Sequence, residues 1–212
     1  MYRMVAVTSH TELEKWISKR ESVCEKKDFA QNPRLWQRYL EQIEKIAASK
    51  MQAVILREKD LPEAVYERLA KEVLAICEAY KKECILHTYA NVALKLGVRK
   101  IHLPLAILEK MAGNSPEILA EFHVLGSSTH SVQEAERACR LGATYITAGH
   151  IYATDCKKGL SPRGISFLKD ICEAVEVPVY AIGGINEENI DEVLRAGAAA
   201  GCIMSGAMRA FS

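Results

Sequence analysis

Short apolar runs alternate with longer amphipathic stretches along most of this 212-residue chain. The runs are rich in Val and Ile and nearly continuous in apolar residues, which is typical of strands buried on both faces of a parallel sheet. They predict eight strands, at residues 4–8, 53–57, 84–87, 100–103, 121–127, 145–149, 178–184 and 201–206. Since strands that alternate with helices form a parallel sheet covered by helices, eight such units predict an α/β fold, the (β/α)8 or TIM barrel.

The stretches between the predicted strands have the periodicity of helices. In PEAVYERLAKEVLAICEAYKK, residues 62–82, apolar residues recur every three or four positions, so one face of the helix is apolar. SVQEAERACRLG begins with Ser131, which can cap a helix, and Glu134 completes a capping-box pattern. The Gly that ends this segment suits a helix C-terminus.

Two segments depart from the regular repeat. Residues 20–38 are charged and weakly patterned, and we expect a surface excursion before the first full helix; whether it forms a lid is open. After the eighth predicted strand only AMRAFS remains, so the closing helix should be short. Another subunit could cover the apolar side that this leaves, which makes a homo-oligomer one expectation. The chain, residues 1–212, is expected to form one compact barrel domain, since about 250 residues is typical of this fold.

Charge and composition limit the possible partners. Lys and Arg number 28 and Asp and Glu number 27, so no global field favours nucleic acid or an acidic membrane, and an anion must be bound locally. We see neither a signal peptide nor a run of about 18 apolar residues, and expect a cytoplasmic protein. The 7 Cys include no CxxC pair, so we expect most of them to be small core residues and not disulfide or zinc sites.

The ends of the last two predicted strands carry small residues. In a (β/α)8 barrel the active site lies at the C-terminal ends of the strands, so residues at these positions are the first candidates. Gly183 and Gly184 end the seventh predicted strand, and Ser205 and Gly206 end the eighth. Glycines let a backbone approach a ligand closely, and N–H groups at the start of a helix attract anions, so these residues predict a phosphate site. For either pair alone, a tight turn is an equally good explanation.

Basic residues and histidines stand at the ends of other predicted strands. His130 follows the fifth strand, and an imidazole there can exchange protons with a ligand near neutral pH. Arg57 ends the second strand, where a guanidinium suits a carboxylate or phosphate, whereas Lys59 could be a ligand contact or a surface charge. His87 and His102 could line the cavity or be satisfied core residues.

Five motifs connect this chain to a known family, because they occur in order and at consistent spacing: VILREKDL, GSSTHSVQEA, GHIYATDCKKGL, PVYAIGGINEENIDEVLRAGA and IMSGA. From about residue 51 to 208 the chain resembles the thiamine-phosphate synthase superfamily of (β/α)8 barrels, and more closely its thiazole tautomerase (TenI-type) branch. The resemblance is strongest from residue 124 onward.

The chain departs from the synthase branch at the residues that hold magnesium. That branch shows an Asn-Asp pair after the third strand and an Asp shortly after an HLGQ motif in the fourth. Here His87 and Thr88 take the places of the pair, and Leu105 and Ile107 those of the Gln and the later Asp. Since a hard cation needs oxygen ligands, we expect no metal and no other cofactor. Residues 154–157 read T-D-C-K, as in tautomerase-like members, where the synthase branch tends to read T-x-T-K.

The resemblance implies a thiazole tautomerase of thiamine biosynthesis that acts on a small-molecule thiazole phosphate. The reaction moves a proton from the ring carbon that bears a carboxylate to an exocyclic carbon, and the aromatic product needs no metal to form. His130 would carry the proton and Arg57 would hold the carboxylate, with Lys59 nearby. The remaining substrate-binding residues implied are Thr154 and Lys157, on a loop that closes over the ligand, and Gly183, Gly184, Ser205 and Gly206, around the phosphate.

Three points stay open at this stage. Cys156 could be a second proton carrier or a spacer. A magnesium-dependent thiamine-phosphate synthase is an alternative that the missing Asp pair disfavours. A non-catalytic binder of a phosphate ligand, such as a regulator, is another, although the sequence has no helix-turn-helix or basic patch for DNA.

Overall fold

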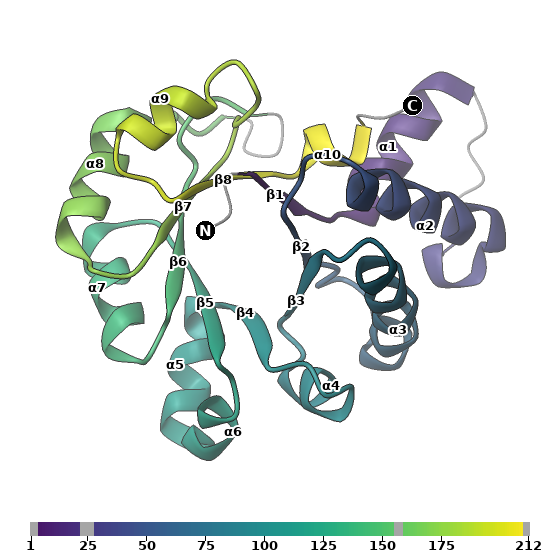
Figure 1. Ribbon diagram of the computed structural model, residues 1–212, viewed down its shortest axis with the longest axis horizontal. Coiled ribbons are helices and arrows are strands. Elements are labelled where there is room, and N and C mark those ends of the chain that lie inside the picture. Colours follow the sequence, from purple (N-terminus) through teal and green to yellow (C-terminus); the bar gives the residue numbers. More distant parts are fainter. Residues whose placement is uncertain (1–3, 22–27, 155–158, 210–212) are drawn as a thin grey trace.

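The computed structural model, which describes residues 4–21, 28–154 and 159–209, is a closed barrel of eight parallel strands surrounded by helices (Figure 1). Each strand pairs with the next, and β8 pairs with β1 to close the barrel. The (β/α)8 prediction is therefore confirmed. The strands are β1 (Met4–Val7), β2 (Ala53–Leu56), β3 (Glu83–His87), β4 (Lys100–Pro104), β5 (Val124–Thr129), β6 (Tyr145–Gly149), β7 (Val179–Ile182) and β8 (Ala200–Ile203).

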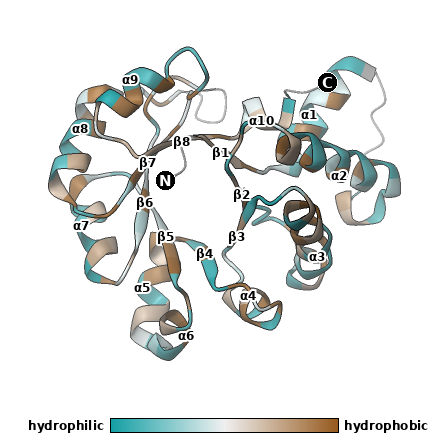
Figure 2. Cartoon of the chain, in the orientation of Figure 1, coloured by the Kyte–Doolittle hydropathy of each residue, from teal (hydrophilic) through white to brown (hydrophobic). Residues whose placement is uncertain are grey.

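The helices lie outside the strands. Along them, hydrophilic residues (teal in Figure 2) alternate with hydrophobic residues (brown), as expected when one face of each helix is buried. They are α1 (His10–Glu21), the 3-10 helix η1 (Phe29–Gln31), α2 (Pro33–Ala48), α3 (Glu63–Ala79), α4 (Ala90–Lys95), α5 (Leu105–Asn114), α6 (Pro116–Ala120), α7 (Val132–Arg140), α8 (Gly164–Ala174), α9 (Ile190–Arg195) and α10 (Ser205–Arg209). The short α10 confirms the expected short closing helix. Within the described ranges, none of these helices is long and apolar enough to cross a membrane.

The fifth strand begins later than the sequence pattern predicts. Residues 121–127 were expected to be extended, but the strand starts at Val124. The backbone N–H groups of Glu121 and Phe122 still donate to carbonyls of α6, those of Ile118 and Leu119. These residues therefore complete a helical turn before the chain enters the barrel.

The prediction for residues 20–38 is wrong in one respect, because a full helix, α1, precedes most of this segment. Buried Leu13 and half-buried Trp16 and Ile17 face the core among charged neighbours, which explains the weak apolar pattern. Residues 22–27 lie outside the described residues. The described remainder forms η1 and the start of α2, whose first turn is capped by the Asn32 side chain. None of these described residues lines the cavity at the barrel mouth.

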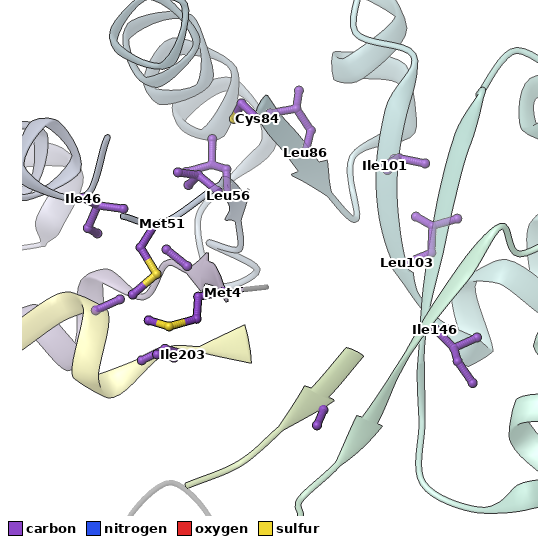
Figure 3. Packing of buried hydrophobic residues seen from close by; sticks show 14 of the residues in the cluster. Met4, Ile46, Met51, Leu56, Cys84, Leu86, Ile101, Leu103, Ile146 and Ile203 are labelled. Carbon is purple, nitrogen blue, oxygen red and sulfur yellow. The ribbon is translucent and has the colours of Figure 1, made fainter. Parts of the chain in front are cut away.

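Two sets of side chains alternate along the strands. Val5 and Val7 of β1 belong to a cluster inside the barrel, whereas Met4 and Ala6 pack against the helices. Figure 3 shows part of the outer set, which includes Met4, Ile46, Met51 and Leu56. The inner set contains Val5, Val7, Ala53, Ile55, Ile85, Tyr145, Tyr180, Ala200 and Cys202. These inner residues fill the barrel beneath its C-terminal mouth.

The five described cysteines are free thiols, and three of them, Cys77, Cys84 and Cys202, are buried. This agrees with the expectation that most cysteines are small core residues. Cys24 and Cys156 lie outside the described residues.

Candidate active site

A cavity of about 440 Å³ opens at the C-terminal ends of the strands. Its size lies within the range of small-molecule sites. Every strand or the segment directly after it contributes to the wall, which consists of Val7, Ile55, Arg57, Lys59, His87, His102, Pro104, Ser128, Thr129, His130, Thr147, Gly149, His150, Thr154, Ile182, Gly183, Gly184, Ile185, Cys202, Ile203, Met204, Ser205 and Gly206.

The structure brings almost all of the predicted site residues around this one cavity. The residues placed there are Arg57, Lys59, His130, Thr154, Gly183, Gly184, Ser205 and Gly206. Lys157, together with Cys156, lies outside the described residues. His87 and His102 also line the cavity, so they are wall residues and not remote core histidines. Sequence reasoning missed Ser128, Thr147 and His150.

His130 is held at the cavity by a neighbouring carboxylate. Its backbone N–H donates to Glu134 Oε2 at 2.6 Å, and its Nδ1 lies 3.3 Å from the same oxygen. The His130 side chain is 48% exposed, so a ligand can reach the ring. As predicted, Ser131 caps α7 by accepting the Glu134 N–H, at 3.1 Å. The Glu134 carboxylate, however, binds His130 and not the Ser131 N–H, and it therefore orients the candidate proton carrier.

Arg57 and its neighbour Glu58 face opposite sides of the barrel wall. Arg57 is half-buried at the cavity, with Nη1 4.0 Å from Met204 Sδ. Glu58 is 2% exposed and points into the helix layer, where it accepts hydrogen bonds from His10 and Tyr39. Lys59 is exposed at the rim. Arg57 and Lys59 therefore line the cavity, whereas the carboxylate of Glu58 binds groups of the helix layer.

The paired glycines after β7 are required by packing. Gly183 and Gly184 have φ of +99° and +68°, a region that side chains disfavour. A Cβ on Gly183 would lie 2.4 Å from His150 Cβ, and one on Gly184 would lie 2.7 Å from the Ala153 carbonyl oxygen. Close contact with the loop after β6 therefore explains both glycines, and it also leaves their backbone on the cavity wall. The structure therefore supports the tight-turn explanation, and the role of these glycines in ligand binding stays a prediction.

Ser205 uses its hydroxyl within the protein. The hydroxyl donates to Glu12 Oε2 at 3.0 Å, and Arg209 donates to the same oxygen at 2.8 Å. Burial would raise the pKa of Glu12, but the hydrogen bonds from Lys15, Ser205 and Arg209 outweigh it and lower that pKa. The Ser205 hydroxyl therefore has a protein carboxylate as its acceptor.

His87 and His102 form a stacked pair in the deep wall of the cavity. They are register partners on β3 and β4, their ring centroids are 5.5 Å apart, and each residue is 3% exposed. His102 Nδ1 lies 2.9 Å from the Tyr145 hydroxyl, and its Nε2 lies 2.8 Å from Ser128 Oγ. Burial, followed by the charge of Arg57, lowers the pKa of His102 to about 3. Burial, His102 and the charges of Arg57 and Lys59 hold the pKa of His87 well below its usual range. Both rings are therefore neutral at pH 7.

We expect this pair to make the fold sensitive to acid. The pKa of a histidine in the unfolded chain is about 6.5, whereas that of folded His102 is about 3. Between these two pH values His102 is protonated in the unfolded chain and neutral in the folded protein, so a decrease in pH favours unfolding. Stability from His102 is thus complete above the unfolded pKa, and each pH unit below it should cost on the order of 1 kcal/mol. Urea unfolding at pH 7, 6 and 5 measures the slope, and His102→Gln should flatten it. An equally steep slope in the variant would contradict the assignment.

The described part of the cavity wall does not fit a magnesium-diphosphate site. Among the described residues that line it there is no Asp or Glu. His87 lies in the wall and Thr88 directly after it, where the synthase branch carries the Asn-Asp pair. Neutral imidazole and hydroxyl groups are poor substitutes for carboxylates around a hard cation.

Comparisons with known proteins agree on the family. A family model described as thiamine monophosphate synthase (TMP-TENI) matches residues 23–207. The putative thiamine-phosphate synthase 2 of Aquifex aeolicus is 32% identical over 180 residues, which cover 84% of this chain and 90% of that protein. Thiamine-phosphate synthase 2 of Streptococcus pneumoniae serotype 4 is 34% identical over 177 residues, 81% of each chain.

A solved structure extends the likeness to the fold. Thiamine phosphate pyrophosphorylase from Pyrococcus furiosus has a TM-score of 0.72 and 22% identity over 98% of this chain and 88% of that one. At this level of identity the likeness shows the fold alone.

Proposed function

Because the chain belongs to the thiamine monophosphate synthase (TMP-TENI) family, we propose that it is a thiazole tautomerase of thiamine biosynthesis. Its substrate would be the exocyclic tautomer of a thiazole carboxylate phosphate, and its product the aromatic isomer. The observation that carries this choice is the donor set of the cavity, which offers basic, neutral and main-chain groups but no carboxylate among its described residues.

The names of the relatives favour a second candidate, thiamine-phosphate synthase. The related proteins named above are called thiamine-phosphate synthases or pyrophosphorylase, and none is called a tautomerase. A synthase joins an aminopyrimidine diphosphate to the thiazole phosphate with the help of magnesium. Since the described wall residues do not suit that metal, we derive no step through it and rank this activity second.

In the proposed reaction the protein binds, orients and moves a proton. His130 would accept the proton from the ring carbon that bears the carboxylate and return it to the exocyclic carbon, so the reaction is a balanced isomerisation. Arg57 would pair with the carboxylate, and Lys59 and Thr154 would approach from the rim. A contact from Lys157 stays a prediction from the sequence. Main-chain groups of Gly183, Gly184, Ser205 and Gly206 would hold the phosphate.

One pair of assays separates the candidates. The purified protein is mixed, without magnesium, with the tautomer made by thiazole synthase, and formation of the aromatic carboxylate is followed by chromatography. The second assay offers the aminopyrimidine diphosphate, the thiazole phosphate and magnesium, and measures pyrophosphate release. Conversion in the first and no release in the second is the expected result. Release of pyrophosphate would favour the synthase, and tight binding with neither activity would favour a non-catalytic binder or regulator.

The expectations about partners and location stay predictions. They are a small-molecule ligand without nucleic-acid or membrane partners, a homo-oligomer, and a cytoplasmic location.

A further inference from the structure

The ring of His87 has one hydrogen-bond partner and one stacking partner, and the backbone of the residue is held as well. Its Nδ1 lies 2.6 Å from Thr88 Oγ1, its backbone N–H donates to the Tyr66 hydroxyl at 2.8 Å, and one face of the ring packs on His102. Thr88 has a φ of +67°, which is unfavourable for a β-branched residue. The surrounding structure therefore maintains a strained backbone that keeps the Thr88 hydroxyl against the ring.

His102, which supports the ring of His87, is itself fixed at both nitrogens. The Tyr145 hydroxyl contacts Nδ1 and the Ser128 hydroxyl contacts Nε2. Gly126 makes room for this arrangement, because a Cβ there would lie 2.1 Å from Cζ of the Tyr145 ring. The face of His102 that supports His87 thus has little freedom to rotate.

The remaining edge of His87 faces the cavity. Among the described residues, the Nε2 atom of His87 has no hydrogen-bond partner. If Nε2 were fully buried it would be a buried polar atom without a partner, but among the described residues the Ser127 hydroxyl is the one side-chain atom of that kind. The Nε2 atom is therefore not enclosed, and since His87 lines the cavity, a ligand can reach it. In the part of the chain that the structure describes, the hydrogen-bond partner of the Thr88 hydroxyl is Nδ1 of His87. When the hydroxyl donates its hydrogen to Nδ1, the hydrogen of the neutral ring is on Nε2.

The charge around this edge indicates what it binds. Burial, His102 and the charges of Arg57 and Lys59 hold the pKa of His87 well below its usual range, so the ring is neutral in a wall that also carries two cations. A neutral N–H next to a guanidinium suits a planar anion with more than one acceptor oxygen.

We propose that His87 is a specificity-determining residue, whose neutral Nε2–H donates to the carboxylate that Arg57 pairs with. This inference rests on the proposed function for the identity of the ligand, a thiazole phosphate with a carboxylate on its ring. His87 would distinguish this ligand from the same thiazole phosphate without the carboxylate, whereas the phosphate contacts would be common to both.

The test compares two ligands and three variants by isothermal titration calorimetry. The ligands are the aromatic thiazole carboxylate phosphate and its decarboxylated analogue. His87→Ala should weaken binding of the first by about 10-fold to 100-fold, the range for a hydrogen bond to a charged group, and change binding of the second little. His87→Gln keeps a side-chain N–H and should restore part of the loss. His123→Ala removes an exposed histidine outside the cavity and should change neither affinity.

If His87→Ala and His87→Gln lost the same affinity for both ligands, the role of His87 would be merely structural and the proposal would be wrong. An unchanged affinity of His87→Ala for the carboxylated ligand would also overturn it. The proposed reaction fails separately. If the wild-type protein binds with the expected selectivity but converts no tautomer, the tautomerase assignment is wrong and the role of His87 stands. If the wild-type protein converts the tautomer but His87→Ala does not change the selectivity between the two ligands, the tautomerase assignment stands and the proposed role of His87 is wrong.

Discussion

Replacing His130 with Asn should slow tautomer conversion by about 10²-fold to 10⁴-fold, the usual contribution of a positioned general acid or base. Asn keeps a polar side chain of similar size but cannot accept and return a proton at neutral pH. Because the proposed ligand contacts come from Arg57, His87 and the main chain around the phosphate, and not from His130, binding of the aromatic product should change little. Single-turnover rates and calorimetric affinities measure the two effects separately.

Glu134 provides the matched control for this variant. Glu134→Gln leaves the imidazole in place but removes the charge that contacts Nδ1 at 3.3 Å, so we expect a smaller loss of rate than in His130→Asn. The two variants should unfold at similar temperatures, because the side chains of His130 and Glu134 are 48% and 38% exposed. If His130→Asn converted the tautomer at the wild-type rate, another group would carry the proton and the proposed role of His130 would be wrong.

The fold could be predicted because its signal is local. Parallel strands buried on both faces are nearly continuous apolar runs, and each of the eight runs became a strand. The first helix was missed because its core contacts come from a few side chains among charged residues, so its pattern is weak. The start of the fifth strand was misplaced because main-chain hydrogen bonds, and not apolar periodicity, extend the preceding helical turn.

The candidate site could be predicted only at the level of which residues share a cavity. Barrel geometry places strand ends together, so Arg57, His130 and the glycines after β7 were expected side by side. What each side chain contacts was not predictable. The pairing of Glu134 with His130, and of Ser205 with Glu12, depends on rotamers and on elements far apart in the sequence. The direction of Glu58, away from the cavity that its neighbours line, is a further example.

Replacing Glu58 with Ala should destabilise the fold by about 3–5 kcal/mol, the range for breaking a buried ion pair. Glu58 Oε2 accepts from the His10 backbone N–H at 2.9 Å and lies 2.7 Å from His10 Nδ1, and Oε1 accepts from the Tyr39 hydroxyl at 2.7 Å. The Ala variant leaves all three groups buried without their acceptor. Urea unfolding at constant pH measures the loss. Glu58→Gln, which keeps an acceptor oxygen, should lose less.

The pH dependence distinguishes an ion pair from simple packing. Burial alone would lower the pKa of His10, but the hydrogen bond and charge of Glu58 outweigh it and raise that pKa. The stability that the pair contributes is therefore complete below the unfolded value of about 6.5 and decreases as the pH rises through the raised folded pKa. The difference between wild type and Glu58→Ala should then be larger at pH 6 than at pH 9. Glu14→Gln is the matched control, since this carboxylate lies 3.8 Å from the other nitrogen of His10 and is 36% exposed. An exposed ion pair contributes about 1 kcal/mol or less, so Glu14→Gln should lower the free energy of unfolding by no more than that. If Glu14→Gln lost as much stability as Glu58→Ala, the buried pair of Glu58 and His10 would not be what holds α1 and α2 to the second strand.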